Sequence, residues 1–556
     1  MKNPELVLKY RELDRDLAEF DGSISGYRSK GKKRFIPTDA NVAEAWEEWK
    51  QLKARVEALE EPDAVFTLVK SHFCDFIDSL EFALQDVAKH PEGRFMGYLW
   101  GFEDISRKGR GTEQEKCDKA IRFFEAYGEN RDDYVALIKE KYDENKKAAV
   151  ANSFRRVALS VTKDSERIDF FFPKFTAEQV AAVKTAMENY AAQLNAMADE
   201  ISTSEVVPAA KLQEDDWSKT CKMDEEEYRT LLKKKLGVNL DELLAWHKSE
   251  IEKTRAEIFE IASKLDIPEK PTNMKEINEI LYKYEGPCDS PEEMFRRCNE
   301  YLKRTRALAH EFVNLPDDEI CKCVPISEGC KDSYPWGGYE GGDFSVRPFQ
   351  GQMFLNQYNY QNVTDGWIKL NSLHEAYPGH HVQYVKTAIS ETPETVKIGA
   401  KYIPILEGTC LRTERAFEWI FGEDPFFPLF VAYRRHHGAV RILVDLSLYY
   451  YGATIEDVVN IYEEELGFER GTARAQVQAH QNMTGYFNCY YYGMKKLTQW
   501  EKEYGFNKKD YTELLFSAGY LSMDSFEQLV KLSPEDRERY LHDFCSLLKE
   551  DFKYEA

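Results

Sequence analysis

Apolar residues recur at three- and four-residue steps through most of the first three hundred residues, and this period constrains the fold more than any other feature. The step matches one face of an α-helix. Ser290 followed by Pro291 and two acidic residues is typical of a helix start. We therefore predict a mainly α-helical protein with a helical N-terminal region over residues 1–312. Its clearest predicted helices span residues 43–59, 66–88, 177–198, 225–236, 240–265 and 291–312.

The pattern changes after residue 314. Residues 316–351 are dense in Pro, Gly and aromatic residues, which predicts a loop-rich stretch. Residues 353–360 alternate in part and are aromatic, which predicts a strand. This strand is either ordinary sheet or the edge that pairs with an extended substrate. Helical patterns resume at Gly366 and continue to the end, so we expect a small β-sheet within a helical protein.

Composition excludes several classes of protein. The chain has 556 residues, enough for about two to four domains, and a net charge of −23. That charge disfavours binding to nucleic acid and to anionic membranes. No apolar run approaches the roughly 18–20 residues of a membrane span, and the first residues are charged, unlike a signal peptide. We therefore expect a cytoplasmic protein.

The eleven cysteines follow no regular framework, which fits reduced thiols. Cys321, Cys323 and Cys330 form the one local cluster in the sequence. A soft-metal site there is the less favoured interpretation, because no second half with matching spacing follows.

Five of the eleven histidines lie between His374 and His437. Neutral imidazole is a common zinc ligand, so this grouping indicates a metal site. His374 and Glu375 open the pattern His-Glu-x-x-His, in which two histidines bind zinc and the glutamate acts on water. The position of the second histidine holds Pro378, so the standard pattern fails.

The next histidines are His380 and His381. On an ideal helix His381 would lie about 10 Å beyond His374, too far to share one ion. A break at Pro378-Gly379 would remove this obstacle, since proline interrupts the helix and glycine tolerates unusual dihedral angles. We prefer His380 as the second ligand because it directly follows the glycine, and His381 stays open. The alternative is a kinked helix whose histidines bind no metal.

Glu407 is the best candidate for a third ligand. It ends an apolar run and precedes Gly408, which permits close approach of another element. An acid among apolar residues is unfavourable unless it is paired or coordinated. Glu414 or Arg412 would orient the ligands. The alternative is a partly exposed helix that carries ordinary ion pairs.

The segment His374-Glu375-Ala376-Tyr377-Pro378-Gly379-His380-His381, followed by Glu407-Gly408 and Glu414, resembles the DUF885 family of predicted bacterial metallopeptidases. The usual family motifs are His-Glu-x-x-Pro-Gly-His-His and Glu-Gly-Trp-x-x-Tyr-x-Glu. The family is similar to the gluzincins and to the thimet-oligopeptidase and thermostable carboxypeptidase groups. The resemblance implies a large multi-helix, zincin-like fold with the small β-sheet next to the active-site helix. It also implies one Zn²⁺ per chain, bound in part by Glu407.

The sequence departs from the family pattern in places. Thr409 and Arg412 stand where the second motif has Trp and Tyr, and Tyr449 stands where a later helix has His. These departures put substrate specificity in doubt more than metal binding.

Other residues would complete the chemistry. Glu375 is the expected general base, because bound zinc lowers the pKa of water to roughly 7 and a carboxylate then moves the proton. An oxyanion needs a further donor, and the segment from His480 to Tyr490 resembles the oligopeptidase segment that supplies one. We rank Tyr490 first, then Tyr486, with His480 as a further candidate. The alternative is an aromatic helix packed into the core.

Arg441 and Asn356 match positions common in the family and are the expected substrate-binding residues. Arg441 would hold a substrate carboxylate, or else pair with Asp445 one turn later.

We therefore predict a zinc-dependent hydrolase that cleaves peptide bonds, most readily in short peptides. Residues 313–556 would form the catalytic metal-binding region, joined to the first region as one two-lobed unit with a cleft between. The alternatives are a zinc enzyme for a non-peptide amide or ester and an inactive helical binding protein. The oligomeric state stays open.

Overall fold

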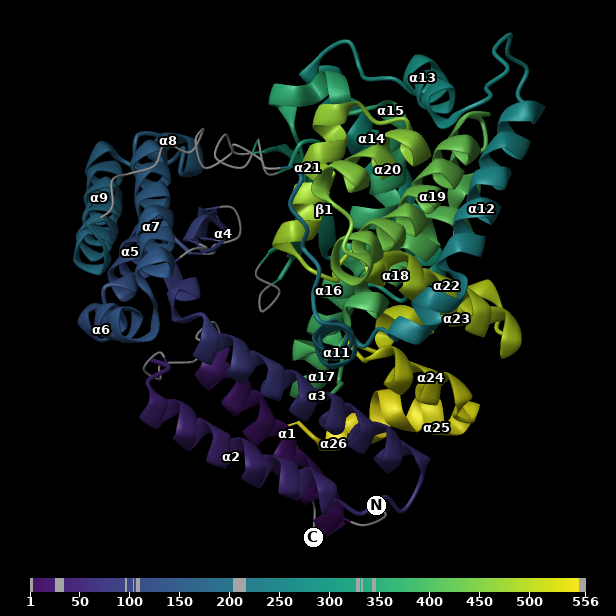
Figure 1. Cartoon of the computed structure of the whole chain (residues 1–556). Helices are drawn as coiled ribbons and strands as arrows, with labels where there is room; N and C mark the ends of the chain where they lie inside the picture. Colours follow the sequence, from purple (N-terminus) through teal and green to yellow (C-terminus); the bar gives the residue numbers. More distant parts are fainter. Residues whose placement is uncertain are drawn as a thin grey trace.

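The computed structural model describes residues 4–25, 35–95, 98–103, 105–106, 111–203, 217–326, 331, 334–342 and 347–549. These residues are mainly helical (Figure 1). Every helix predicted from the period is confirmed. They are α2 (Asp39–Glu57), α3 (Ala64–Lys89), α9 (Ala177–Ile201), α11 (Glu225–Thr230) with its π-helical continuation η3 (Leu231–Leu236), α12 (Leu240–Lys264) and α14 (Pro291–Phe312). Ser290 caps α14 by accepting a hydrogen bond from the backbone N–H of Glu293.

One group of helices has a core of its own. It comprises α4 (Tyr98–Glu103), α5 (Glu113–Tyr127), α6 (Arg131–Lys141), α7 (Glu144–Ser165), α8 (Ile168–Phe171) and α9, at the left of Figure 1. Large buried side chains such as Phe102, Phe124 and Phe154 fill this core. The group is therefore a separately packed lobe.

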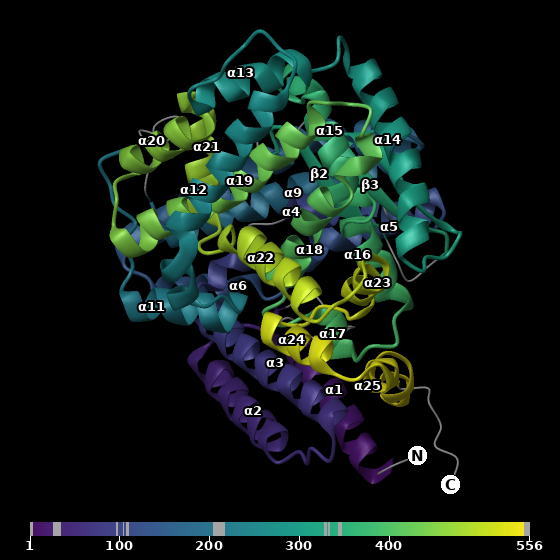
Figure 2. The ribbon, with the colours of Figure 1, turned by 90° about the vertical axis from the view of Figure 1, so that its right-hand side faces the viewer.

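The first helices pack against the last ones. α1 (Pro4–Ser25) contacts the short helix α17 (Glu394–Ile398), where Asp14 accepts hydrogen bonds from the backbone of Glu394 and Thr395. α3 lies beside α24 (Met523–Lys531) and α25 (Pro534–Glu538) (Figure 2). Tyr10 packs edge-on against Phe544 of η9 (Arg539–Phe544), which leads into α26 (Cys545–Leu547). One hydrophobic core thus joins the two ends of the described chain. The predicted division at residue 312 stays a prediction.

A three-stranded sheet lies beside the C-terminal helices. Its central strand is β3 (Phe349–Leu355), parallel to β1 (Glu319–Pro325) and antiparallel to β2 (Gly337–Gly341). The small sheet is confirmed, but the loop predicted over 316–351 is wrong in part, because β1 and β2 lie within it.

The predicted strand 353–360 is also wrong at its end. It stops at Leu355, where the side chain of Asn356 caps the 3-10 turn η5 (Gln357–Asn362) by accepting from the backbone of Tyr358 and Asn359. β3 is not the sheet edge that we considered for substrate, because β1 and β2 occupy both of its sides.

The remaining helices form the main body around the sheet. α15 (Asp365–Asn371), the π-turn η6 (Ser372–Ala376) and α16 (His380–Ile389) follow the sheet. α18 (Ile403–Ala416) packs along α22 (Asn488–Glu503), and α19 (Phe427–Leu446) packs along α12. The other elements are η1 (Pro91–Phe95), α13 (Met274–Tyr284), η7 (Glu418–Phe421), η8 (Ser447–Tyr451), α20 (Ile455–Leu466), α21 (Arg470–Asn482) and α23 (Lys508–Ser517).

None of the described helices combines the length and the apolar character that crossing a membrane requires. Cys321 and Cys323 lie on β1, and Cys330 lies outside the described residues. Within the described ranges neither of these two cysteines belongs to a group with metal-binding geometry.

Candidate metal centre

The helix is broken within the segment that carries the histidines. α15 runs into the π-turn η6, which ends at Ala376, and α16 begins at His380 after the cis bond Tyr377–Pro378 and Gly379. A Cβ atom on Gly379 would lie 2.0 Å from the carbonyl oxygen of His374, so only glycine fits this turn. The turn folds α16 back, and the rings of His374 and His380 lie 5.1 Å apart.

Glu407 of α18 meets both histidines. Its Oε2 lies 3.5 Å from Nε2 of His374 and 3.4 Å from Nε2 of His380. The three residues offer ligand atoms that all lie within 4.8 Å of one another. Two ligand atoms of a tetrahedral zinc site lie about 3.3 Å apart when each bond is about 2.0–2.1 Å. The spacing therefore matches the size of a zinc site.

A second polar partner holds each of the three side chains. Nδ1 of His374 lies 2.7 Å from Oε1 of Glu414, and Nδ1 of His380 lies 2.8 Å from Oε1 of Gln383. Tyr486 donates a hydrogen bond to Oε1 of Glu407. These partners leave both Nε2 atoms and Oε2 of Glu407 pointing at one another. Such contacts orient the ligands in known metal sites.

Oε2 of Glu407 is buried and has no hydrogen-bond partner among the described residues. A buried carboxylate oxygen without a partner is costly, so its presence calls for a ligand. Two neutral imidazoles and one carboxylate are a donor set that zinc accepts. The residues therefore fit a bound zinc ion.

The electrostatics of Glu407 and His374 agree with this proximity. Burial acts to raise the pKa of Glu407, but His380 and His374 outweigh it and hold that pKa well below its ordinary value. Burial acts to lower the pKa of His374, but the nearby carboxylates of Glu407 and Glu414 outweigh it and the pKa is raised. The cluster therefore favours an ionised Glu407, the form that binds a cation.

His381 faces away from this cluster. Its Nε2 lies 2.7 Å from Oε2 of Glu319, and its Nδ1 lies 3.0 Å from the hydroxyl of Tyr339. Burial acts to raise the pKa of Glu319, but His381, Tyr377 and His310 hold it at about 2. His381 thus anchors α16 to the sheet, and His380 is the histidine that the structure brings to His374 and Glu407.

Glu375 and two tyrosines surround the cluster. Glu375 follows His374 on η6, is half-buried, and makes no hydrogen bond or ion pair with the rest of the described chain. The ring of Tyr490 stacks on His374 at 6.2 Å with an interplanar angle of 11°. The ring of Tyr486 lies 5.8 Å from that of Tyr490. The carboxylate of Glu375 therefore has no partner among the described residues and is available to act on a ligand at the cluster.

Two other predicted site residues, His480 and Asn356, make structural hydrogen bonds. Nδ1 of His480 lies 3.0 Å from Asp445, and its Nε2 lies 2.9 Å from the hydroxyl of Tyr462, so both ring nitrogens are occupied. The side chain of Asn356 is 1% exposed and bonds to the backbone of Lys331 and of Tyr334 as well as capping η5. Neither side chain is brought to the cluster by a hydrogen bond.

The structure also separates the candidates for orienting the ligands. Glu414 bonds to His374, whereas Arg412 forms a two-bond ion pair with Glu501. Arg441 does not pair with Asp445, whose carboxylate bonds to Tyr228, His480 and Asn488.

Two residues that were not predicted as part of the site also touch His380. Gln383 bonds to its ring, and Sγ of Cys410 lies 3.4 Å from the same Nδ1. The signal for Gln383 was its place three residues after His380, on the same helix face. Cys410 had a similar signal, three residues after Glu407.

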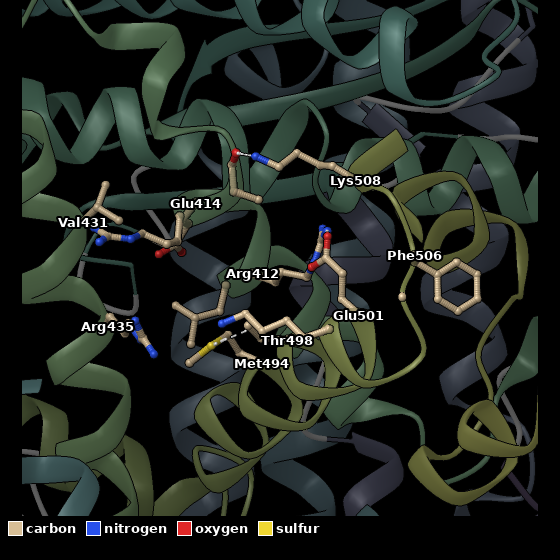
Figure 3. A pocket seen from close by; sticks show the side chains of 14 residues that line it. Arg412, Glu414, Val431, Arg435, Met494, Thr498, Glu501, Phe506 and Lys508 are labelled. Atoms are coloured by element: carbon tan, nitrogen blue, oxygen red, sulfur yellow. Dashed lines mark hydrogen bonds and ion pairs between the residues drawn. The ribbon is translucent and has the colours of Figure 1, made fainter. Parts of the chain in front are cut away.

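A cavity of about 440 Å³ lies behind the cluster, between α18, α19 and α22. Figure 3 shows its walls, where Arg412 faces Glu501 and Glu414 lies on the opposite side. His374, His380 and Glu407 do not line it, so this cavity is distinct from the space at the ligand atoms. Glu414 connects the two, because it lines the cavity and also bonds to His374 of the cluster.

Comparison with known proteins identifies one matching family and two solved structures with a similar fold. The model of a family described as "Bacterial protein of unknown function (DUF885)" matches residues 13–530. No curated protein matches the sequence. Two solved structures bear the description "putative lipoprotein", one from Colwellia psychrerythraea and one, of unknown function, from Shewanella oneidensis.

The Colwellia protein superposes with a TM-score of 0.67 at 15% identity, over 95% of this chain and 98% of its own. The Shewanella protein superposes with a TM-score of 0.69 at 16% identity, over 94% of this chain and 99% of its own. At these identities the likeness shows a shared fold over nearly the whole length.

Proposed function

This chain belongs to the DUF885 family, and we propose that it is a zinc-dependent hydrolase that cleaves peptide bonds in short peptides. One observation carries the proposal: the buried Oε2 of Glu407, which has no hydrogen-bond partner in the described chain, faces the Nε2 atoms of His374 and His380 at 3.5 and 3.4 Å. Two histidines and one glutamate are the protein ligands of one class of catalytic zinc sites, which keep a fourth position for water or substrate.

Zinc bound there would supply a Lewis acid and would lower the pKa of a nearby water. His374, His380 and Glu407 would hold it, and we propose the zincin-like arrangement on that basis. The donor set also argues for zinc over magnesium or calcium, which prefer oxygen ligands alone.

Glu375 would act as the general base. Glu375 is half-buried, directly follows a ligand candidate, and makes no hydrogen bond within the described ranges. It would take a proton from the attacking water and deliver it to the leaving amine. Tyr490 is the first candidate for stabilising the oxyanion, because the hydroxyl of Tyr486 already donates to Glu407.

Burial of the site supports short peptides as substrates. His374 is 3% exposed and Glu407 is 4% exposed. A folded protein chain does not reach side chains at this depth without large rearrangement, whereas a short peptide does.

The proposal is tested by metal analysis and a peptide-library assay on the wild type and on Glu375→Gln. We expect about one zinc per chain in both proteins. Peptide cleavage should fall at least 100-fold in the variant, since general-base catalysis contributes about 10²–10⁴-fold. Glu464→Gln is the matched control, because Glu464 is exposed.

Metal-free protein from a chelator-free purification would overturn the zinc site. A zinc-loaded wild type that cleaves esters or non-peptide amides but no peptide would overturn the substrate class. A zinc-loaded protein with no hydrolysis at all would favour a binding protein.

The cytoplasmic location stays a prediction. The ten described cysteines are free thiols. Both structural neighbours, however, carry the word lipoprotein in their descriptions.

A further inference from the structure

Arg441 is a buried cation that forms no ion pair with any described residue. It is 7% exposed, and its Nε and Nη1 atoms are buried with no hydrogen-bond partner among the described residues. The nearest acid along its helix, Asp445, bonds instead to Tyr228, His480 and Asn488. A buried guanidinium is costly unless its N–H groups are satisfied. Its donors are therefore available to a ligand.

Aromatic rings place Arg441 beside the metal cluster. Its Cζ lies 4.7 Å from the ring of Phe487 and 5.0 Å from the ring of Tyr490. Tyr490 also contacts His374, whose ring lies 6.2 Å away in a parallel stack. One tyrosine thus separates the guanidinium from a proposed zinc ligand.

A second arginine faces the same ring. Arg434 lies two turns before Arg441 on α19, and its Cζ is 5.7 Å from the ring of Tyr490. Its one carboxylate neighbour in the described chain is Glu414, at 3.8 Å, which is already bonded to His374. The side chain of Arg434 is 17% exposed, so of the two arginines Arg434 is the one that reaches solvent.

Positive charge from Arg434 and Arg441 therefore exceeds negative charge at this face of α19. Burial lowers the pKa of Arg441, and the nearby charge of Arg434 lowers it further. His437 lies between the two arginines on the helix, and its Nε2 is also buried with no hydrogen-bond partner in the part of the chain that the structure describes. Stacking on Phe487 and Tyr490 offsets part of the cost of burying Arg441, but it satisfies none of the N–H donors.

We propose that Arg441 and Arg434 form the site for the C-terminal carboxylate of the peptide substrate, so that this protein is a carboxypeptidase. The inference rests on the hydrolase function proposed above. Guanidinium groups bind carboxylates through their charged N–H donors, and the Nε and Nη1 atoms of Arg441 have no hydrogen-bond partner in the described chain.

The carboxylate at the end of the chain is the favoured anion for two reasons. Every peptide carries it, whereas acidic side chains occur only in some. The two arginines and His374 also contact the same ring, that of Tyr490, and one residue spans about 3.8 Å of peptide chain. Binding here would therefore direct cleavage to the first or second bond from the C-terminus.

The test compares N-acetylated tripeptides that end in a free carboxylate with the same peptides as C-terminal amides. The zinc-loaded wild type should cleave the free acids with kcat/KM about 10- to 100-fold higher, since a charge-assisted hydrogen bond contributes about that factor. Arg441→Lys should raise KM for the acids by a similar factor, so that the preference for the free acid over the amide is lost. Arg434→Gln, at a more exposed position, serves if Arg441→Lys fails to fold.

Arg470→Gln is the control, because Arg470 is exposed on α21 and pairs with Glu456 and Glu463. Equal cleavage of acids and amides, or cleavage at internal bonds of longer peptides, would overturn the carboxylate site and leave the hydrolase function standing. A preference for acidic side chains over the terminal carboxylate would overturn it as well.

A binding measurement separates this inference from failure of catalysis. Zinc-loaded Glu375→Gln should bind an N-acetylated dipeptide acid about 10-fold or more tightly than its amide in calorimetry, and Arg441→Lys in that background should remove the difference. Binding of both forms with equal affinity would contradict the site even if no substrate were ever cleaved.

Discussion

At the scale of single residues, each ligand candidate depends on a partner that occupies its other polar atom. Glu414, Gln383 and Tyr486 hold His374, His380 and Glu407 respectively. Without these partners, imidazole rings and a carboxylate would rotate and share other hydrogen bonds. The partners therefore decide which atoms face the shared space.

Glu414→Gln tests this dependence. The amide oxygen still accepts a hydrogen bond from Nδ1 of His374. The substitution removes, however, the negative charge that makes the imidazole a stronger ligand. We expect zinc affinity to fall about 10- to 100-fold, as in other sites that lose such a partner. Competition with a chelating dye measures the change, and Glu464→Gln controls for the loss of one charge. Unchanged affinity would mean that Glu414 only fills space.

At the scale of elements, the cluster depends on how closely α18 approaches α22. The two helices meet at glycines: a Cβ on Gly408 would lie 2.6 Å from the backbone of Gly493, and a Cβ on Gly493 would lie 1.9 Å from the carbonyl oxygen of Pro404. Since Glu407 precedes Gly408, the position of its carboxylate is set by this contact.

Gly493→Ala should therefore push the helices apart. Overpacking of this kind costs about 1–3 kcal/mol, and we expect both a lower Tm and weaker zinc binding. Gly471→Ala is the matched control, because Gly471 also lies on a helix and nothing surrounds its Cβ position within 4 Å. That control should leave the Tm unchanged or slightly raised. Equal Tm and zinc affinity for both variants would show that the contact is not tight.

At the scale of the whole molecule, the core is continuous from the first helices to the last, and α3 is central to it. His72 on α3 is fully buried beside Phe73 and Phe76. Burial lowers its pKa to about 4. The ordinary pKa of histidine is about 6.5.

This shift predicts how stability depends on pH. Between pH 6.5 and 4 the unfolded chain protonates His72 and the folded chain does not, so the unfolded state binds more protons and stability falls as the pH is lowered. From pH 7 to pH 5 the loss due to His72 should be on the order of 2 kcal/mol.

His72→Phe should remove that part of the pH dependence. The comparison is the free energy of unfolding in urea at pH 7 and pH 5, measured on metal-free protein so that release of zinc does not contribute. His542→Phe, at an exposed site, should keep the wild-type dependence. An identical pH dependence in His72→Phe and the wild type would contradict the shift.

The sequence alone determined the helices, because a period of three to four apolar residues is a local property that tertiary contacts here reinforce. It also indicated the break after His374, since proline lacks the backbone donor that a helix needs. The glycine next to Glu407 likewise indicated close packing before its partner Gly493 was known.

Only the tertiary structure decided which histidine meets Glu407. His380 and His381 are adjacent and chemically equal, and the choice depends on Glu319 and Tyr339 of the sheet, which hold His381. The same holds for His480, which bonds to the buried Asp445, and for Asn356, which bonds to the backbone of residues far from it in sequence. Such partners are far apart in sequence, so no local pattern records them. The strands β1 and β2 escaped prediction for the same reason, because their pairing with β3 is a long-range contact.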